Sequence, residues 1–316
     1  MISVTNDTKS FFENECAPIY IYGAGDYGTW TAWFMQKCGM HFEGFIDKAV
    51  EGRDNVFVLG KKVAHPEMLR SLPKMRLRII IATLQAEGVM AELPWYAENI
   101  DAVCMVPIYK NLISDGKRYN INIFLSYFRA KLITAEVPTI LSNRCTAGFI
   151  YRALGTGILS PTINTGISWE GFMKICRNPK DYLSEDMVFG YWTKALNGIR
   201  PVGRLRDVEV LFGHEEDEAQ AVNRWNRMRK WINWNNIIYV MSDTRPAPLN
   251  TVLPYHIAKE FCSLKEKHLL LMNQYLYAGK KLPGCMYVEN IYFHNEEKVI
   301  ESWFDLLGWI NGEYEL

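Results

Sequence analysis

Three residues of the types used in nucleophilic catalysis each stand at the end of a predicted strand. They are Cys145, His214 and Asp243. Because the carboxyl ends of parallel strands share one edge of a sheet, we expect the three side chains to converge there. A thiol, an imidazole and a carboxylate in one place are the groups of an activated cysteine nucleophile. The strands are predicted over residues 137–143, 206–214 and 235–243.

The segment after Cys145 predicts a helix that ends at Gly155, with Ser142 or Asn143 as its cap. A cysteine in the first turn of a helix lies at the positive end of the peptide dipoles, which favours the thiolate. Backbone N–H groups of that turn are candidates for an oxyanion hole. The alternative interpretation makes Cys145 a small buried apolar residue, His214 a helix cap and Asp243 a turn residue.

A second chemical motif lies near the N-terminus, where Gly23, Gly25 and Gly28 follow the short strand 19–22. This G-x-G-x-x-G pattern permits a tight turn, a close backbone approach to phosphate and close packing of helix on strand. Asp47 ends the next strand, about 20 residues further on, where a carboxylate can accept a hydrogen bond from a ribose hydroxyl. We expect a nucleotide as the ligand; the alternative is a glycine turn kept for packing alone.

Polar residues in the second half are candidates for contacts with a substrate. Asn164 and Thr165 lie in a loop with the types of side chain that bind sugars, and Asn143 lies beside Cys145. Arg229 belongs to a basic cluster at the end of the helix after His214, predicted either as a solvated face or as a clamp for phosphates. The segment 233–235 is predicted as a turn around a buried indole.

These motifs need elements that position them, and the pattern predicts an α/β protein. Residues 1–116 are expected to form a Rossmann-like domain with a parallel sheet, and residues 117–136 a connecting helix. Residues 137–316 are expected to form a second α/β domain. Its closing amphipathic helix, 295–312, carries aromatic residues that suit either the core or a homo-oligomer contact.

Composition limits the classes of function. The 316 residues include 35 Lys plus Arg and 35 Asp plus Glu, and this balance argues against broad binding to nucleic acid. We expect a cytoplasmic protein, because the sequence has neither a signal-peptide pattern nor an apolar run long enough to span a membrane. The 7 cysteines lack CxxC spacing and the 6 histidines are scattered, so no disulfide framework or metal site is predicted.

Residues 18–110 contain "IYGAGDYG", "GFIDK", "VAHPEML" and "RIIIAT". These segments resemble the nucleotide-sugar-binding N-terminal domain of bacterial sugar O-acyltransferases. The resemblance implies a nucleotide-sugar in the glycine loop. The left-handed β-helix of that family is absent, so its acyl transfer is not implied.

Residues 137–250 contain "ILSNRCTAGFIYRALG", "SPTINTGI" and "PVGRLRDVEVLFGH". They resemble a family of unknown activity found in bacterial capsule and exopolysaccharide gene clusters. More distantly, the order Cys, His, Asp resembles papain-like cysteine peptidases, which implies Cys145 as nucleophile, His214 as base and Asp243 as the residue that orients His214. The spacing of 69 residues between Cys145 and His214 is shorter than in typical enzymes of that kind.

The sequence therefore leads to three hypotheses. The first is a transferase of bacterial cell-surface polysaccharide biosynthesis, acting on a nucleotide-linked sugar or glycan intermediate. The second is a thiol hydrolase or acyltransferase that uses Cys145, His214 and Asp243. The third is a nucleotide-binding partner, without enzyme activity, of a glycan assembly complex.

Overall fold

The structure is a computed structural model. It describes residues 1–13, 16–107, 112–114, 117–119, 121–195, 198–243, 253–273, 282–288 and 305–313. The chain divides into two compact units. The first contains Met1–Leu132 together with Ala153–Gly155, and the second contains Ile133–Arg152 and Thr156–Leu316.

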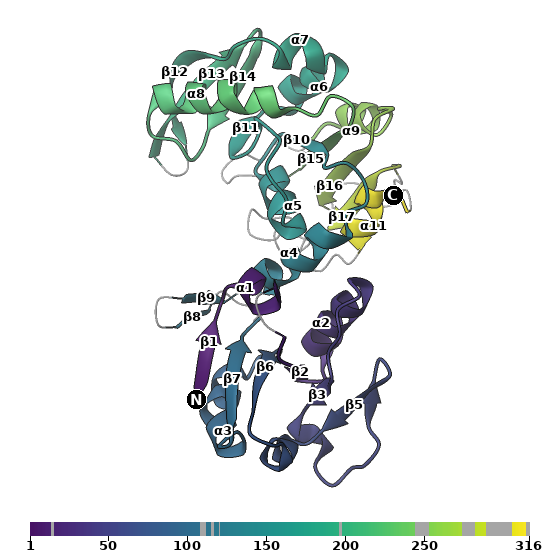
Figure 1. The fold of residues 1–316 in the computed structure, drawn as a ribbon. Helices are drawn as coiled ribbons and strands as arrows, with labels where there is room; N and C mark the ends of the chain where they lie inside the picture. The colour runs from purple at the N-terminus through teal and green to yellow at the C-terminus, as the bar shows by residue number, and fades with distance from the viewer. Residues whose placement is uncertain are drawn as a thin grey trace. The chain divides into compact units, whose positions relative to one another are not determined.

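The first unit is built on a seven-stranded sheet (Figure 1). Its order is β1-β7-β6-β2-β3-β5-β4, and every pair is parallel except β4 with β5. Its elements are β1 (Ile2–Thr5), α1 (Thr8–Glu13), β2 (Ile19–Tyr22), α2 (Asp26–Lys37), β3 (Gly44–Ile46), η1 (Lys48–Val50), β4 (Phe57–Val58), β5 (Lys61–Ala64), η2 (Pro66–Ser71), β6 (Met75–Ile81), α3 (Ala86–Tyr96), β7 (Ile100–Met105), β8 (Leu112–Ser114), β9 (Lys117–Tyr119) and α4 (Ile121–Leu132).

The strand order identifies the fold of this unit. Counted from β2, the parallel strands β5-β3-β2-β6-β7 follow the order 3-2-1-4-5 of a Rossmann fold, and β1 adds a further strand beside β7. The chain moves in opposite directions from β2 and from β6, so right-handed crossovers put α2 and α3 on opposite faces of the sheet. The continuous apolar run of β6 fits a strand that is covered on both faces. The direction of connection reverses between β2 and β6, where such folds bind ligands.

The second unit contains two sheets. The sheet β10-β15-β16-β17 is parallel throughout, and the sheet β11-β14-β13-β12 is antiparallel. Its elements are β10 (Thr139–Ser142), α5 (Thr146–Leu154), β11 (Thr165–Ile167), α6 (Trp169–Arg177), α7 (Pro179–Leu183), β12 (Val188–Ala195), β13 (Gly198–Leu205), β14 (Val208–Phe212), α8 (Glu218–Met228), η3 (Arg229–Trp231), β15 (Ile237–Ser242), α9 (Tyr255–Phe261), β16 (His268–Asn273), β17 (Cys285–Val288) and α11 (Asp305–Asn311).

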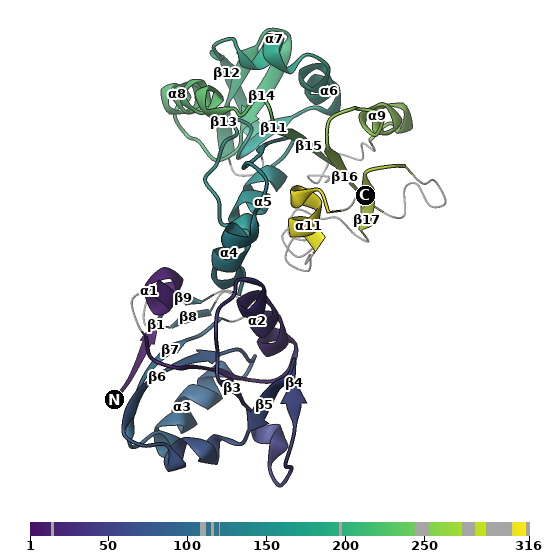
Figure 2. The ribbon, with the colours of Figure 1, turned by 45° about the vertical axis from the view of Figure 1, so that its right-hand side comes forward.

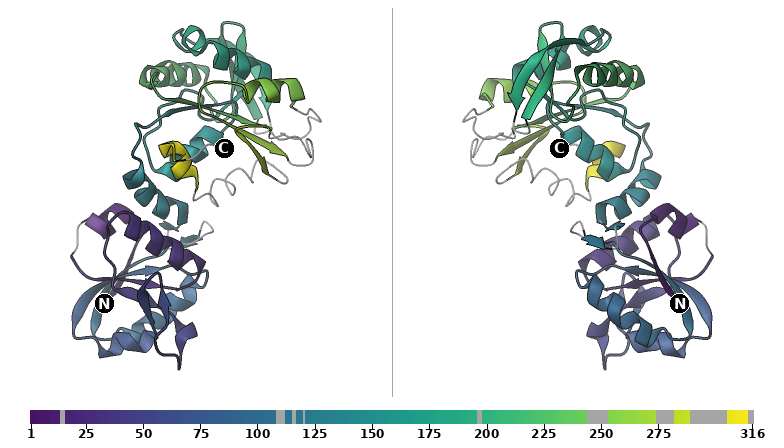
Figure 3. Two further views of the ribbon diagram at one scale, coloured as in Figure 1. Left: turned by 90° about the vertical axis from the view of Figure 1, so that its right-hand side faces the viewer. Right: turned by 90° about the vertical axis from the view of Figure 1, so that its left-hand side faces the viewer.

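One hydrophobic core joins the two sheets of this unit. It includes Leu141 and Tyr239 from the parallel sheet and Phe212 from the antiparallel sheet. Helix α8 covers β12 and β13 and contributes Trp225 to the core (Figure 2). Figure 3 shows the later strands of this parallel sheet in olive, with α9 next to them. Burial of these apolar faces is the main force that holds the unit together.

The predicted α/β class is confirmed, but one strand lies in a different sheet from the one expected. We predicted that the strand before His214 belongs to the parallel sheet. It is instead β14, which forms a hairpin with β13 because Arg206 adopts a left-handed backbone with φ of 56° in the tight turn after Leu205. A turn this short joins antiparallel strands only.

Two further predictions concern the helices. The expected connecting helix is α4, which groups with the first unit. Part of the closing helix, 295–304, lies outside the described residues. Within its described part, Trp309 of α11 is 3% exposed and belongs to the core. In the described ranges, no helix combines the length and apolar character that crossing a membrane requires.

Candidate functional site

Cys145 and His214 come together in the second unit. The Sγ atom of Cys145 lies 3.8 Å from Nε2 of His214. Cys145 is partly buried, and His214 is exposed in the turn that follows β14. An imidazole at this distance can take the proton of the thiol, which leaves a thiolate nucleophile. The structure thus joins the first two residues of the predicted set.

The turn between β10 and α5 fixes the position of Cys145. The hydroxyl oxygen of Ser142 accepts a hydrogen bond from the Ala147 N–H at 3.2 Å, so Ser142 caps this helix start. The Gly148 N–H donates to the carbonyl oxygen of Cys145 at 2.9 Å. Two N–H groups of the first turn are therefore already engaged, and in this conformation they do not form the oxyanion hole that the sequence suggested.

Asn143 connects the two strands that flank this turn. Its Nδ2 donates to the Ser242 carbonyl oxygen at 3.2 Å, and its Oδ1 accepts from the Ser242 N–H at 2.9 Å. Its own carbonyl oxygen accepts from the Ile167 N–H at 3.0 Å, and the residue is fully buried. We predicted a contact with substrate for Asn143, but the structure uses its amide to hold β10 and β15 together.

Asp243 lies at the end of β15 and is 1% exposed. Its Oδ1 accepts from the Leu253 N–H at 3.2 Å, and its N–H donates to the Leu271 carbonyl oxygen at 2.9 Å. Among the residues that the structure describes, His214 makes no hydrogen bond with Asp243. The structure therefore shows a Cys–His contact here, and the hydrogen bonds that it shows for Asp243 go to Leu253 and Leu271.

An ion pair with little exposure lies next to the Cys–His pair. Nε of Arg224 is 2.6 Å from Oε1 of Glu215, and the side chains are 17% and 14% exposed. Nη1 of Arg224 donates to the Ile163 carbonyl oxygen at 2.8 Å. Burial lowers the pKa of Arg224, whereas the Glu215 carboxylate and the nearby Cys145 thiolate raise it. Because the interaction is mutual, the guanidinium also stabilises a thiolate at Cys145.

The sequence contains a signal for Arg224 that we did not use. Ala221, Trp225 and Met228 are buried on one face of α8, and Arg224 falls on the same stripe of positions i, i+3, i+4 and i+7. Arginine is rarely buried unless it is paired, so an arginine on an apolar stripe indicates a buried partner. The pairing with Glu215 follows from the fold of the loop before the helix.

The remaining predicted contacts with substrate lie in different places. Oδ1 of Asn164 is 4.0 Å from where a Cβ at Gly148 would stand, so Asn164 lies against the helix that follows Cys145. Thr165 is 2% exposed, and its hydroxyl donates to the Thr162 carbonyl oxygen at 2.8 Å. Asn164 remains a candidate for contact with substrate, whereas the hydroxyl of Thr165 has a structural partner.

Arg229 is held by residues at the end of α7. Its Nη1 donates to the Ser184 carbonyl oxygen at 2.7 Å, and its Nη2 pairs with the Asp186 carboxylate. The side chain is 17% exposed. The structure therefore shows Arg229 tying η3 to the loop before β12, and not beside Cys145.

The glycine loop of the first unit has the geometry of a phosphate cradle. Gly23 has a φ of 108°, and a Cβ there would lie 2.6 Å from the Ala82 carbonyl oxygen. A Cβ at Gly28 would overlap the carbonyl oxygen of Gly23. A Cβ at Gly25 would meet nothing within 4 Å, and no side chain caps α2 at this residue. The open space lies at the start of α2, where the helix N–H groups favour an anion.

Asp47 participates in this loop. Its Oδ2 accepts from the Ala24 N–H at 2.8 Å and its Oδ1 accepts from the Ala49 N–H at 2.9 Å. A carboxylate has about four lone-pair sites, so both oxygens can still accept from ribose hydroxyls. The residues present therefore fit the phosphate and ribose of a nucleotide-sugar or NAD. In the described part of the chain, no three side chains of His, Cys, Asp or Glu are grouped to hold a metal ion.

The chain matches a known family over most of its length. The sequence model of a domain of unknown function, DUF1919, matches residues 115–314. The chain belongs to the DUF1919 family. The matched DUF1919 region extends beyond the resemblance noted over 137–250, and it contains Cys145, His214 and Arg224.

One relative of this DUF1919 protein is described as an uncharacterized protein of Haemophilus influenzae. It is 27% identical over 134 residues, which is 42% of this chain and 61% of the relative. The chain thus spans less than two thirds of that relative's length. The link to capsule gene clusters and the likeness of the N-terminal unit to sugar O-acyltransferases stay predictions.

Proposed function

We propose that this protein is a transferase of bacterial cell-surface glycan biosynthesis that carries an acyl group on Cys145. The observation that carries the proposal is the 3.8 Å approach of Cys145 Sγ to His214 Nε2 at the start of α5. The glycan setting is supported by the resemblance over 137–250, and a nucleotide-linked sugar is supported by the fit of the glycine loop to phosphate.

The reaction has two halves. In the first, the Cys145 thiolate attacks the carbonyl carbon of an acyl donor, the bond from that carbon to the leaving group breaks, and His214 gives the leaving group the proton taken from the thiol. In the second, a sugar hydroxyl gives its proton to His214 and attacks the thioester. The carbon–sulfur bond then breaks, His214 returns the proton to the sulfur, and the sugar carries the acyl group.

The surroundings of Cys145 support this chemistry. The Arg224 guanidinium and the positive end of the α5 dipole both favour negative charge at the sulfur. The Glu215 carboxylate holds Arg224 in place through their ion pair. The exposure of His214 leaves the imidazole open to a sugar hydroxyl.

The glycine loop supplies a place for the nucleotide. Gly25 leaves room for phosphate, and the N–H groups at the start of α2 can donate to its oxygens. The carboxylate of Asp47 lies where it can accept from a ribose hydroxyl. The sugar of a nucleotide-sugar bound here belongs to the class of sugar that the protein acylates.

We expect cells that carry Cys145→Ser in the native gene to lose the acyl groups of their surface polysaccharide. Serine keeps the size of the side chain but lacks the acidic thiol on which the two half-reactions depend. The measurement is the acyl content of purified polysaccharide. The control is Cys16→Ser, because Cys16 is an exposed cysteine. Normal acylation with Cys145→Ser at normal protein levels contradicts the proposal.

A further inference from the structure

A cavity lies at the end of the second unit's parallel sheet that is opposite to Cys145. Its volume is about 410 Å³, and it opens at the amino ends of β15 and β16, where Ile237 and Lys267 line it. Cys145 follows the carboxyl end of β10, which runs parallel to β15. The cavity is thus separate from the Cys–His pair. Its size falls within the range of small-molecule sites.

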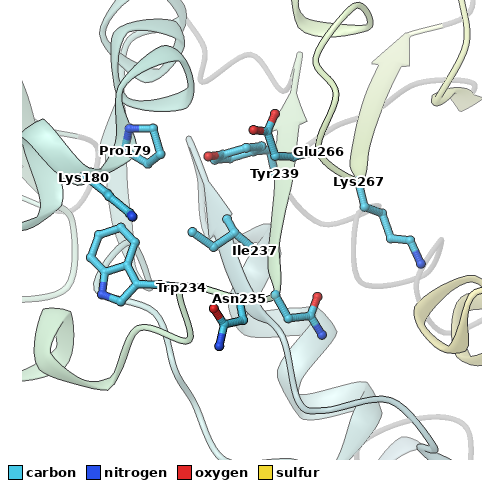
Figure 4. A pocket seen from close by; sticks show the side chains of 9 residues that line it. Pro179, Lys180, Trp234, Asn235, Ile237, Tyr239, Glu266 and Lys267 are labelled. Atoms are coloured by element: carbon cyan, nitrogen blue, oxygen red, sulfur yellow. The ribbon is translucent and has the colours of Figure 1, made fainter.

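Trp234 forms one wall of the cavity (Figure 4). We predicted a buried indole here, but its exposure is 38%. The loop that carries Trp234 is held firmly by Asn233, whose N–H donates to Thr139 Oγ1 at 2.7 Å and whose Oδ1 accepts from the Asn235 N–H at 3.2 Å. Nδ2 of Asn236 donates to the Glu136 carbonyl oxygen at 2.6 Å. The indole is therefore presented to the cavity by a fixed loop.

Three polar side chains line the cavity around the indole: the Lys180 ammonium, the Asn235 amide and the Glu266 carboxylate. Figure 4 shows Lys180 extending toward Trp234 and Lys267 pointing away. Among the described residues, these three side chains make no hydrogen bond or ion pair. The Lys180 ammonium and the Asn235 amide NH₂ can donate hydrogen bonds to a ligand. The Asn235 amide oxygen and the Glu266 carboxylate can accept hydrogen bonds from it.

Tyr239 lines the cavity, and Figure 4 shows its ring next to the Glu266 side chain. The residue is fully buried, and among the described residues its hydroxyl has no hydrogen-bond partner. Burial raises the pKa of Tyr239, and the charges of Cys176 and Glu266 raise it further, so the phenol stays protonated as a donor. A buried hydroxyl without a partner is unfavourable, and a ligand that accepts from it removes this cost.

We propose that this cavity binds a sugar ring of a glycan. The Trp234 face packs against the C–H face of a pyranose, and Lys180, Asn235 and Glu266 bind its hydroxyls. The inference rests on the proposed function for the class of ligand, but it does not require Cys145. It gives the protein a contact with glycan away from the Cys–His pair.

The test is saturation-transfer NMR on the full chain with glucose, galactose, N-acetylglucosamine and glucuronic acid, each alone. We expect at least one sugar to show contact signals. Trp234→Ala should weaken its affinity by about tenfold or more, because a tryptophan wall is lost. Trp231→Ala is the matched control and should keep the affinity, since Trp231 is 49% exposed and does not line the cavity.

Two further variants separate this site from the proposed catalysis. Tyr239→Phe should weaken the sugar signals while the melting temperature stays equal or rises, because the unpartnered hydroxyl is gone. Cys145→Ser should keep the signals in full. No signal from any of the four sugars, or signals that survive Trp234→Ala, would each overturn the sugar site and leave the proposal for Cys145 standing.

Discussion

Replacing His214 with alanine should slow the alkylation of Cys145 by iodoacetamide at pH 7 by about tenfold or more. The imidazole lies 3.8 Å from the sulfur and takes the thiol proton, so its loss lowers the fraction of thiolate. Because His214 is exposed, the substitution removes little packing. The rate is measured by mass spectrometry of the peptide that contains Cys145.

The protein contains its own controls for this experiment. His41→Ala removes another exposed histidine, one paired with Glu43, and should leave the rate unchanged. Cys104 and Cys262 are buried, and burial raises the pKa of each thiol to about 12. A raised pKa keeps a thiol protonated at all pH values below it, so both should resist alkylation from pH 7 to pH 9. Equal rates for Cys145 with and without His214 would remove the base from the proposed mechanism.

The second large effect is expected in the glycine loop. Gly28→Ala should destabilise the first unit by about 3 kcal/mol, which lowers its melting temperature by about 10 °C. The added Cβ overlaps the carbonyl oxygen of Gly23, and that residue cannot move freely. The Gly23 N–H donates to the Ile46 carbonyl oxygen at 2.8 Å, and the Gly23 φ of 108° already favours glycine. Differential scanning calorimetry of the full chain measures the change.

Gly25→Ala is the matched control. Its φ is −79° and an added Cβ meets nothing within 4 Å, so the cost in stability should stay within about 1 kcal/mol. Equal melting temperatures for the two variants would mean that the close approach of Gly28 to Gly23 does not hold the loop, and the cradle geometry would lose its physical basis.

The first unit was predictable because Gly23 and Gly28 each have a local steric reason. The turn after β2, the start of α2 and the carboxylate of Asp47 all follow from a pattern of about 30 neighbouring residues. Asp47 additionally bonds the Ala24 N–H, a detail that depends on the close approach of β3 to the loop. Strand order follows from the alternation of strands and helices together with the right-handed crossover rule.

The second unit was less predictable, because its contacts join distant parts of the chain. The tight turn of Arg206 and Asp207 contains no glycine, proline or asparagine, so Asp207 is a weak local signal for the hairpin that moves β14 out of the parallel sheet. His214 reaches Cys145 despite this error. Asp243 was assigned from its position at a strand end, but its carboxylate bonds the Leu253 N–H.

Two features of the second unit, the burial of Arg224 and the exposure of Trp234, were not predicted from the sequence. Arg224 belongs to the same basic cluster as Arg229, which we predicted as a solvated face or a phosphate clamp because the charge order along α8 also fits the helix dipole. Its position on the buried stripe was the more informative signal. The loop of Trp234 is held by a hydrogen bond from the Asn233 N–H to Thr139, nearly a hundred residues earlier in the chain. A local sequence pattern does not predict a contact between such distant residues.

The most direct test of the account is limited labelling of the unaltered protein with less than one equivalent of iodoacetamide at pH 7, followed by peptide mapping. We predict that Cys145 takes up the label before the more exposed Cys16, because the His214 imidazole and the Arg224 guanidinium favour the thiolate of Cys145. Label that appears first on Cys16, with Cys145 unmodified, would contradict the claim that Cys145 is an activated nucleophile.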